Sequence, residues 1–529
     1  MLSSIRLILP LNLIQNHFNF YNPLNVKKIF LFLGFLLTFS KANIYAQKSS
    51  TQAEIIKPYL SIIDQICKDF AQKEHLPSLV YGLVVDGKLV HSGNIGVINT
   101  TTKTVANNAS VYRIASMTKS FAAMAILQLR DTGKLRLDDP AYLYIPELKG
   151  QKLSTDSPEI TIRHLLTHAA GFPEDNPWGD RQLAISDETM LKMFKKGISF
   201  SNSPGTAYEY SNTGFAMLGY IIKKVSGQSY QIYINDNILK PLGMVNTYWD
   251  YTKVPQNQLV KGYRYLDENW VEQPMLGDGA YGAMGGMLTT MDDFAKYTAF
   301  HLSDGVSDAK ESPVLKRSSL REMHQPWNII TFNTENKNAA GKLMPFVSAY
   351  SYGLRWVEDA DHKIGIGHSG GLPGFGSNWK ILPKYNIGII AFANGTYAPV
   401  NELNLQLLDT LITLAQLKPK PLAVSPILKQ RQSALVNLLP AWENAEATGI
   451  FAENFFLDYF PNTLRKEAEG IFNKVGKILK VNEIVPENNL RGAFVMEGEK
   501  GNIEVSFTLS PENPALIQEY NIREISKRN

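Results

Sequence analysis

Strand-like segments lie at two distant ends of a long region of this chain, and the residues between them are mostly helical in pattern. At one end, apolar runs at 79–85 and 89–96 are joined by Asp86-Gly87, a dipeptide typical of a hairpin turn. At the other end, strand-like runs occur at Tyr350–Val357, Lys363–His368, Ser377–Leu382 and Asn386–Phe392. The simplest fold places both sets of strands in one antiparallel sheet flanked by helices, with the helical middle inserted beside it as a subdomain. The sequence therefore predicts an α+β protein.

The helical segments have apolar residues at spacings of three and four, and several end at glycine or proline. They are predicted at 53–70, 118–131, 161–167, 214–225, 230–239, 291–302 and 400–417.

A Pro- and Lys-rich stretch begins at Lys418 and is typical of a linker, which we assign to 418–429. Beyond it, the patterns predict a small α+β domain over 430–529. Its helix is expected at 457–475 and its strands at 478–485, 492–496, 503–509 and 517–525. No chemical motif occurs there, so we interpret it as an accessory domain.

The first 46 residues have the features of an export signal and an upstream leader. Lys27 and Lys28 precede an apolar run, Ile29–Phe39, and small or polar residues follow as far as Ala46. We expect cleavage after Ala46, a main domain over 47–417, and a periplasmic or secreted location in a bacterium. A run of this length is too short to span a bilayer, so no stable membrane span is expected after cleavage. An uncleaved anchor is the alternative.

Composition excludes several classes of protein. Of 529 residues, 44% are hydrophobic and 19% charged, which is ordinary for a globular chain. The formal net charge of +4 comes from the leader, so the rest lacks the basic excess of a nucleic-acid binder. A single cysteine, Cys67, excludes an intramolecular disulfide and a multi-cysteine zinc site. We therefore expect no nucleic-acid partner.

Ser116 and Lys119 pair a nucleophile with a base at the start of a predicted helix. A spacing of three places the lysine one helical turn after the serine, so its amine can reach the hydroxyl. Two other Ser-x-x-Lys spacings occur, at Ser307…Lys310 and Ser377…Lys380. The first lies in a Gly/Asp-rich loop, and the second lies in a strand, where this spacing puts the side chains on opposite faces. A plain helix cap is the alternative for Ser116.

Two further segments could contribute to a site. Tyr210-Ser211-Asn212 lies where a short extended run gives way to a helix, whereas the similar Tyr-x-Asn at 233–235 lies within a helix and is interpreted as structural. His368-Ser369-Gly370-Gly371 is expected to end a strand and enter a glycine-rich turn, where backbone N–H groups can face a ligand. His91-Ser92-Gly93 has a similar pattern but precedes the serine.

In this order, Ser-x-x-Lys, Tyr-x-Asn and His-x-Gly resemble the serine β-lactamase and penicillin-binding-protein superfamily. The resemblance is strongest to its class C β-lactamase-like branch, which includes esterases and D-amino-acid-specific peptidases. Three other segments are also similar to that branch: 164–171, 240–244 and 285–290. The resemblance spans roughly 53–417 and implies a β-lactamase/transpeptidase-like fold.

The resemblance also implies a role for each motif residue. Ser116 would be acylated, and Lys119 and Tyr210 would share general-base work, for which both need lowered pKa values. Asn212 would orient Lys119 and the substrate amide. The backbone N–H groups of Ser116 and Gly371 would form the oxyanion hole. The substrate-binding segment would comprise His368, Ser369, Gly370 and Gly371. The resemblance implies a small-molecule or peptide substrate, with no metal and no organic cofactor.

One departure from the superfamily pattern concerns the substrate. His368 stands where typical members carry lysine, and an imidazole is mostly neutral at about pH 7. This favours esters or amides of low charge, so an esterase or D-peptide hydrolase is expected. A true β-lactamase or DD-carboxypeptidase is one alternative. A penicillin- or peptide-binding sensor without turnover is another.

Two other interpretations are weaker. Gly367–Gly371 also matches the Gly-x-Ser-x-Gly turn of α/β-hydrolases, with Ser369 as nucleophile, but that fold needs a histidine after the serine and none follows. His164 and His168 have the spacing of a helical metal pair, but no glutamate accompanies them. We therefore assign these histidines to packing or capping.

Overall fold

The computed structural model describes residues 51–303, 312–337 and 341–526. The predicted export signal and the Ser307…Lys310 pair lie outside these ranges. The chain divides into two compact units, 1–55 and 56–529, and the architecture below belongs to the second, apart from residues 52–55. In the described ranges, no helix combines the length and the apolar character needed to cross a membrane.

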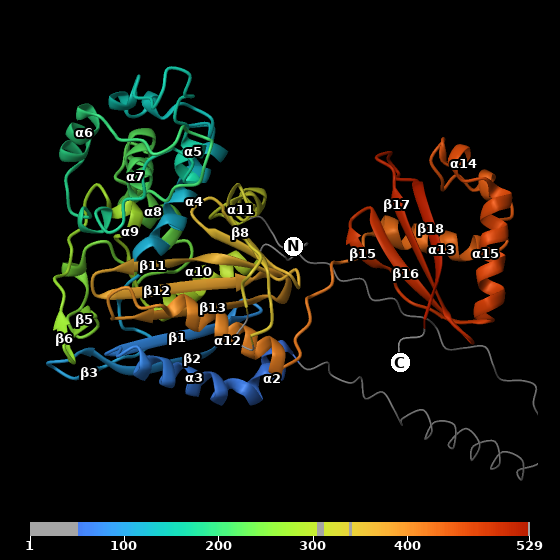
Figure 1. Cartoon of the computed structure of the whole chain (residues 1–529), viewed down its shortest axis with the longest axis horizontal. Coiled ribbons are helices and arrows are strands. Elements are labelled where there is room, and N and C mark those ends of the chain that lie inside the picture. Colours follow the sequence, from blue (N-terminus) through green and yellow to red (C-terminus); the bar gives the residue numbers. More distant parts are fainter. Residues whose placement is uncertain (1–50, 304–311, 338–340, 527–529) are drawn as a thin grey trace, which may run out of the picture. The chain divides into compact units, whose positions relative to one another are not determined.

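A nine-stranded antiparallel sheet forms the centre of the larger part of this unit (Figure 1). Its strands in spatial order are β3 (Thr104–Val105), β2 (Lys88–Asn99), β1 (Ser78–Val85), β13 (Ile387–Ala393), β12 (Phe375–Leu382), β11 (Ile364–Leu372), β10 (Arg355–Asp359), β9 (Phe346–Tyr350) and β8 (Asn328–Asn333). The first hairpin, β1–β2, joins the late strands through β1 and β13, with Leu79 opposite Ala393. The prediction that strands from both ends share one sheet is confirmed.

Helices cover both faces of this sheet. Helices α3 (Leu60–Lys73) and α12 (Val400–Leu414) pack on one face, and α10 (Met291–Leu302) packs on the other. Alternate residues of β1 therefore enter different cores: Leu79 and Leu83 join α3 and α12, whereas Val80 and Val84 join the core that contains α10. Burial of both faces explains why this strand is an unbroken apolar run.

The helical middle contains most of the remaining helices. They are α4 (Thr118–Asp131), α5 (Ile162–Leu166), α6 (Asp187–Lys196), α7 (Asn212–Ser226), α8 (Tyr230–Ile234), α9 (Gly282–Gly285) and α11 (Arg317–Met323), and α2 (Gln52–Ile56) begins the described chain. The helix predicted over 230–239 changes to a π-helix after Ile234. Two short antiparallel pairs of strands complete this region: β4 (Tyr112–Arg113) with β7 (Leu288–Thr289), and the hairpin of β5 (Tyr263–Leu266) with β6 (Asn269–Glu272). Helix α4 packs against α7 and α9, and eleven of its residues are buried.

The prediction of a single strand over Tyr350–Val357 is wrong, because a turn after Tyr350 separates β9 from β10. Ser351 N donates to Leu354 O at 2.7 Å and closes the turn. Gly353 has φ +67°, a conformation that favours glycine. The sequence pattern did not predict this turn, because Tyr352 and Leu354 continue the apolar pattern of the strand.

Residues 426–526 form a second sheet with its own core. Its strands are β14 (Ile478–Val481), β16 (Arg491–Gly498), β17 (Asn502–Leu509) and β18 (Ile517–Ile525) in spatial order, with β15 (Val485–Asn488) also paired to β16. The helices there are α13 (Pro426–Leu438), α14 (Phe455–Asp458) and α15 (Pro461–Val475). The strand expected over 478–485 and the helix over 457–475 are each two elements.

Helix α13 was missed by the sequence analysis and begins inside the stretch assigned to a linker, 418–429. The Ser425 hydroxyl accepts from Leu428 N at its start, and proline occupies its first turn. Both are signals of a helix N-terminus. Leu428 and Leu435 are buried in the core of the second sheet.

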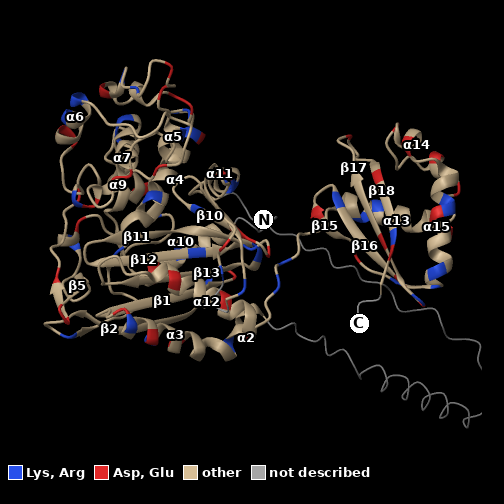
Figure 2. Ribbon diagram, in the orientation of Figure 1, with Lys and Arg blue, Asp and Glu red and all other residues tan. Residues whose placement is uncertain are grey.

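Charged residues of both signs are interspersed over the described chain (Figure 2). Lys and Arg number 53 and Asp and Glu number 49 in the full sequence.

Candidate active site

Ser116 and Lys119 lie at the N-terminal end of the buried helix α4. Ser116 occupies a 3₁₀ turn, Ala115–Met117, that leads directly into the helix, and Lys119 lies in the first helical turn. The Lys119 amine donates to Ser116 Oγ at 2.9 Å. Lys119 is fully buried, whereas Ser116 is 8% exposed and lines a pocket. The structure thus brings together the pair expected from the spacing.

The turn before Ser116 is held by close contacts with the sheet. Ala115 has φ +49°, an uncommon conformation for a residue with a side chain. Ser377 Oγ on β12 donates to Ile114 O at 2.8 Å. A Cβ on Gly370 would lie 2.1 Å from the same carbonyl oxygen, so only glycine lets β11 approach this closely. Ser377 therefore contacts the turn and is not paired with Lys380 as a second nucleophile.

The second motif is placed by the N-terminus of α7. Ser211 caps this helix by accepting from Gly214 N at 3.2 Å, and Asn212 is its first residue. Asn212 Oδ1 accepts from the Lys119 amine at 2.7 Å. Tyr210 lines the pocket, and its ring centroid lies 4.9 Å from Lys119 Nζ. The other Tyr-x-Asn spacing, 233–235, lies in α8 and the following π-helix.

Lys119 has three hydrogen-bond acceptors but no carboxylate among them. Besides Ser116 and Asn212, Met284 O accepts from its amine at 2.8 Å. Burial lowers the pKa of Lys119 to about 7, because desolvation disfavours the charged amine. The negative charges of Asp180 and Asp175 oppose this change. A substantial fraction of the amine is therefore uncharged at neutral pH and able to accept a proton.

The expectation that Tyr210 has a lowered pKa is wrong. Burial raises the pKa of this phenol above its usual value, and its interaction with Ser116 only partly opposes the effect. Desolvation acts in opposite senses on the two groups, because the charged form is the ammonium in lysine and the phenolate in tyrosine. The phenol keeps its proton at neutral pH, so Lys119 is the group suited to act as a base.

Two residues that the sequence analysis missed hold the second motif in place. Asp175, which is 9% exposed, accepts from Asn212 N at 2.6 Å and from Thr213 N at 2.8 Å. Asn176 Oδ1 accepts from Asn212 Nδ2 at 2.5 Å, which turns the Asn212 amide oxygen toward Lys119. The Asp-Asn-Pro stretch has turn character in the sequence. Only folding brings it to the start of α7.

The third motif lies within β11 and does not enter a turn as expected. Gly370 pairs with Ser377, and Gly371 pairs with Gly376, so the strand continues to Leu372. The segment His368, Ser369, Gly370 and Gly371 lines the same pocket as Ser116. The chain therefore reverses later than predicted. The two glycines allow β11 to lie close to the Ser116 turn and to Tyr397, and they do not form the chain reversal.

His368 is buried and uncharged. Its Nδ1 lies against Ser369 O, which can only accept, so Nδ1 carries the proton. Its Nε2 therefore accepts from the Tyr350 hydroxyl at 2.9 Å. Burial, with the positive charges of Lys119 and Arg355, lowers the pKa of His368 well below its usual value. The prediction of a neutral imidazole at this position agrees with that direction.

Arg355 places an exposed positive charge in the pocket and was not identified from the sequence. The pocket has a volume of about 730 Å³, and its lining includes Arg355 and the acidic residues Glu174 and Asp180. Arg355 lies on β10 opposite Gly367 of β11, one residue from His368. Its guanidinium carbon is 5.9 Å from the Tyr210 ring centroid. Only the strand register shows that this arginine belongs to the site.

His164 and His168, which have the spacing of a metal-ligand pair, each form a different structural contact. His164 Nδ1 accepts from Thr161 N at 3.2 Å in the capping box of α5, and His168 Nδ1 accepts from Ser211 N at 3.1 Å. The His168 ring also packs against Tyr210, with ring centroids 4.3 Å apart. Capping and packing, as interpreted from the sequence, account for both residues. In the part of the chain that the structure describes, no group of three or more His, Cys, Asp or Glu is arranged to hold a metal ion.

Comparison with known families gives the same assignment as the motif order and the fold. A family model for β-lactamase matches residues 63–412, most of the region around the nine-stranded sheet. The chain belongs to the β-lactamase family. This membership confirms the superfamily predicted from the three motifs.

Proteins of similar sequence occur in Staphylococcus aureus and in Dictyostelium discoideum. Protein flp of Staphylococcus aureus (strain COL) is 30% identical over 361 residues, which cover 66% of this chain and 66% of the relative. β-Lactamase-like protein 4 of Dictyostelium discoideum is 28% identical over 356 residues, covering 63% of this chain and 59% of the relative. The chain thus spans 66% of the length of the first of these relatives and 59% of the second.

Two solved structures share the family fold. An octameric penicillin-binding protein homologue from Pyrococcus abyssi aligns with a TM-score of 0.57 and 21% identity, over 89% of this chain and 96% of that protein. A class C β-lactamase aligns with a TM-score of 0.54 and 22% identity, over 69% and 98%. The predicted β-lactamase/transpeptidase-like α+β fold is confirmed.

Proposed function

We propose that this member of the family is an exported serine hydrolase that forms an acyl-enzyme on Ser116 from an ester or amide substrate. One observation carries the proposal: the buried Lys119 amine lies 2.9 Å from Ser116 Oγ, and its pKa is lowered to about 7. A serine hydroxyl is a weak nucleophile without an adjacent base. Lys119 is such a base, and Ser116 opens onto the pocket.

Acylation follows from this geometry. Ser116 Oγ attacks the substrate carbonyl carbon while Lys119 takes the hydroxyl proton, and the bond to the leaving group then breaks as that group receives the proton. The backbone N–H groups of Ser116 and Gly371 are proposed to stabilise the oxyanion, where losing one donor typically costs about 2.7–4 kcal/mol. Water then attacks the acyl-enzyme, again with Lys119 as base. Asn212 holds the amine in place through its 2.7 Å hydrogen bond.

Uncharged esters and amides fit the neutral His368, and they are the first substrate class to test. Arg355 supports a second class, substrates with a carboxylate, such as the C-terminus of a D-peptide or the acid group of a β-lactam. A guanidinium binds a carboxylate through two parallel hydrogen bonds. DD-carboxypeptidase or β-lactamase activity is therefore the second candidate function.

The intact mass of the mature protein after exposure to a fluorophosphonate tests the nucleophile. We expect one adduct on the wild type and none on Ser116→Ala. An adduct that persists in Ser116→Ala would assign the reaction to another serine. Absence of an adduct on the wild type, together with no ester turnover, would contradict the proposal.

Turnover distinguishes the hydrolase from a binding or sensing protein that uses the same pocket. Phenyl esters, D-peptides and β-lactams can each be offered at substoichiometric enzyme, and product formed in excess of enzyme requires deacylation. A stable adduct with no product release would support the sensor.

We further propose the organisation expected from the sequence: an export signal with its leader over 1–46, a catalytic domain over 47–417, a linker over 418–429 and an accessory domain over 430–529. N-terminal sequencing of the exported protein tests cleavage after Ala46. A chain that ends at Leu417 is expected to retain turnover, and loss of activity on every substrate in a folded truncated protein would assign the accessory domain to the site.

A further inference from the structure

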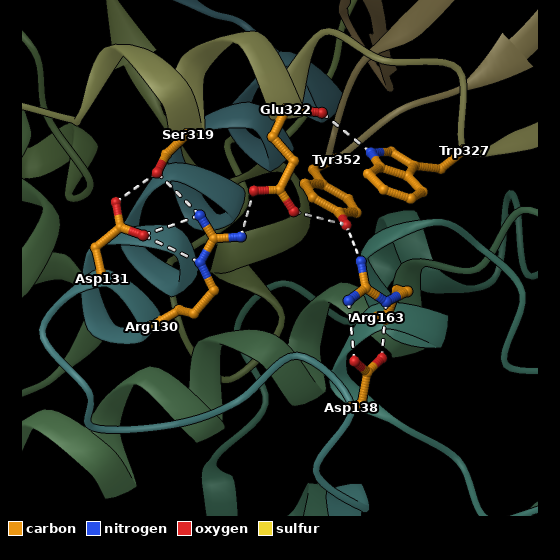
Figure 3. A network of polar contacts seen from close by, with 8 residues as sticks. All are labelled: Arg130, Asp131, Asp138, Arg163, Ser319, Glu322, Trp327 and Tyr352. Atoms are coloured by element: carbon orange, nitrogen blue, oxygen red, sulfur yellow. Dashed lines mark hydrogen bonds and ion pairs between the residues drawn. The ribbon is translucent and has the colours of Figure 1, made fainter. Parts of the chain in front are cut away.

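A chain of polar contacts connects α4, α11 and α5 to the turn between β9 and β10 (Figure 3). Arg130, at the end of α4 distant from Lys119, donates to Glu322 Oε2 at 2.5 Å. Glu322 Oε1 accepts from the Tyr352 hydroxyl at 3.3 Å, and Arg163 donates to that same hydroxyl oxygen. Arg163 also forms two hydrogen bonds to Asp138, at 2.7 and 3.0 Å.

Tyr352 is the member of this network that belongs to the turn. Its side chain is fully buried, and its ring stacks on Trp327 with centroids 5.2 Å apart and planes 6° apart. The Trp327 indole N–H in turn donates to Glu322 O at 3.0 Å. The turn is thus held in place by the stacking of Tyr352 on Trp327 and by the Tyr352 hydroxyl, which bonds to Arg163 and Glu322.

On its inner side the turn contacts the residues of the site. A Cβ on Gly353 would lie 2.8 Å from Lys119 O, so this part of the turn rests directly on the backbone of the lysine. Tyr350 and Arg355 flank the turn as register partners, and directly opposite residues of an antiparallel pair lie on the same face. Tyr350 donates to His368, and Arg355 lines the pocket.

Arg355 has little side-chain support of its own. Across the described residues it forms no ion pair, and its one hydrogen bond, to the Tyr208 hydroxyl, is 3.5 Å long. The place of its guanidinium is therefore set mainly by the backbone from which it projects. That backbone begins at the turn held by Tyr352.

We propose that Tyr352, held by Arg163 and Glu322, is a positioning residue that sets Arg355 relative to Ser116 and thereby determines the preference for anionic substrates. The inference rests on the proposed function, because it assigns a substrate property to the same site. A purely structural network would change stability, or lower turnover of all substrates alike. A positioning residue changes the preference between charged and uncharged substrates.

The test compares two substrates that differ by one carboxylate, the phenyl and the 3-carboxyphenyl esters of N-phenylacetylglycine. Tyr352→Phe keeps the ring and its stack on Trp327 and removes only the hydroxyl. We expect KM for the carboxyphenyl ester to rise about fivefold, as for the loss of one hydrogen bond, with a change below about twofold for the phenyl ester. Melting temperatures of both proteins show that the variant is folded.

Ser319→Ala is the matched control from the same network. Ser319 accepts from Arg130 at 2.9 Å and donates to Asp131 at 2.5 Å, at the end of the network away from the turn. Its removal is expected to leave the substrate preference unchanged. Should Tyr352→Phe fail to fold, Arg163→Lys keeps the charge beside Asp138 but cannot bridge to Tyr352, and a smaller loss of preference in the same direction is expected.

Four outcomes would overturn the inference. An unchanged preference in Tyr352→Phe or an equal loss on both esters would assign the network to stability alone, and an equal shift in Ser319→Ala would show general loosening. No turnover of either ester by the wild type, with no Ser116 adduct, would overturn the proposed function and this inference together. Turnover with an unaltered preference in the variant would overturn this inference alone.

Discussion

The two sides of the pocket treat positive charge in opposite ways. On the side formed by α4 and α7, Lys119 is fully buried, has three hydrogen-bond acceptors and has a pKa lowered to about 7. On the side formed by β9, β10 and β11, the pocket histidine is uncharged, and Arg355 remains exposed with one long hydrogen bond. A base needs a dry, fixed setting, whereas a group that binds an ion must remain accessible to it.

Replacing the base on the α4 side gives the largest expected effect. Lys119→Met keeps an unbranched side chain and removes the amine, so kcat/KM is expected to fall by about 10³-fold. In the wild type, only the deprotonated amine can accept the serine proton, so kcat/KM should rise as pH increases through about 7. The variant should lose this rise.

The measurement is kcat/KM on the phenyl ester across this pH range. Lys134→Met, which removes an exposed lysine just beyond the same helix, is the control and should behave as wild type. A wild-type profile that is flat through neutrality would show that Lys119 is not a buried base.

Asp175→Asn tests how the α4 and α7 side is held in place. Asp175 accepts from the first two backbone N–H groups of α7 and also from the Thr213 hydroxyl. We expect kcat to fall about tenfold and the free energy of unfolding to fall by about 1–3 kcal/mol, because a buried acceptor is weakened.

Urea unfolding and kcat measured on one preparation check this pair of effects. Asp187→Asn, at the exposed N-terminus of α6, removes a carboxylate whose ion pair with Lys223 is exposed, so it should change stability by less than about 1 kcal/mol. Equal effects of the two substitutions would contradict the conclusion that Asp175 holds the start of α7 in place.

Arg355→Gln tests the binding side. If Arg355 binds an anionic group, KM for the carboxyphenyl ester should rise about tenfold, whereas the phenyl ester and the pH profile should be nearly unaffected. Arg181→Gln, at an exposed arginine outside the pocket lining, is the charge-matched control. An equal loss on both esters would contradict the division between a reacting side and a binding side.

His368→Gln gives the smallest expected effect. The glutamine side chain can still accept from Tyr350, and His368 is already uncharged, so kcat/KM should change by less than about threefold. The rise with pH should remain where it is in the wild type. A shift of this rise to another pH would mean that His368 titrates in the pH range of activity. It would contradict the contrast between an uncharged His368 and a titrating Lys119.

Local patterns predicted much of the fold because they depend on neighbouring residues. The β1–β2 hairpin follows from its turn residues, and α4 follows from apolar spacing that ends near Gly133. The turn between β9 and β10 was missed because its reason lies elsewhere, in the packing of Gly353 against Lys119. The β11 glycines were expected in a turn for the same reason, since their close neighbours come from distant segments.

The sequence by itself determined which hydroxyl meets which amine, because a spacing of three on a helix places Lys119 beside Ser116 whatever surrounds them. It also determined the order of the three motifs and hence the family. Only the tertiary structure decided the charge states of Lys119, Tyr210 and His368, because these depend on desolvation. It also decided that Arg355 enters the pocket, because strand register brings β10 beside β11.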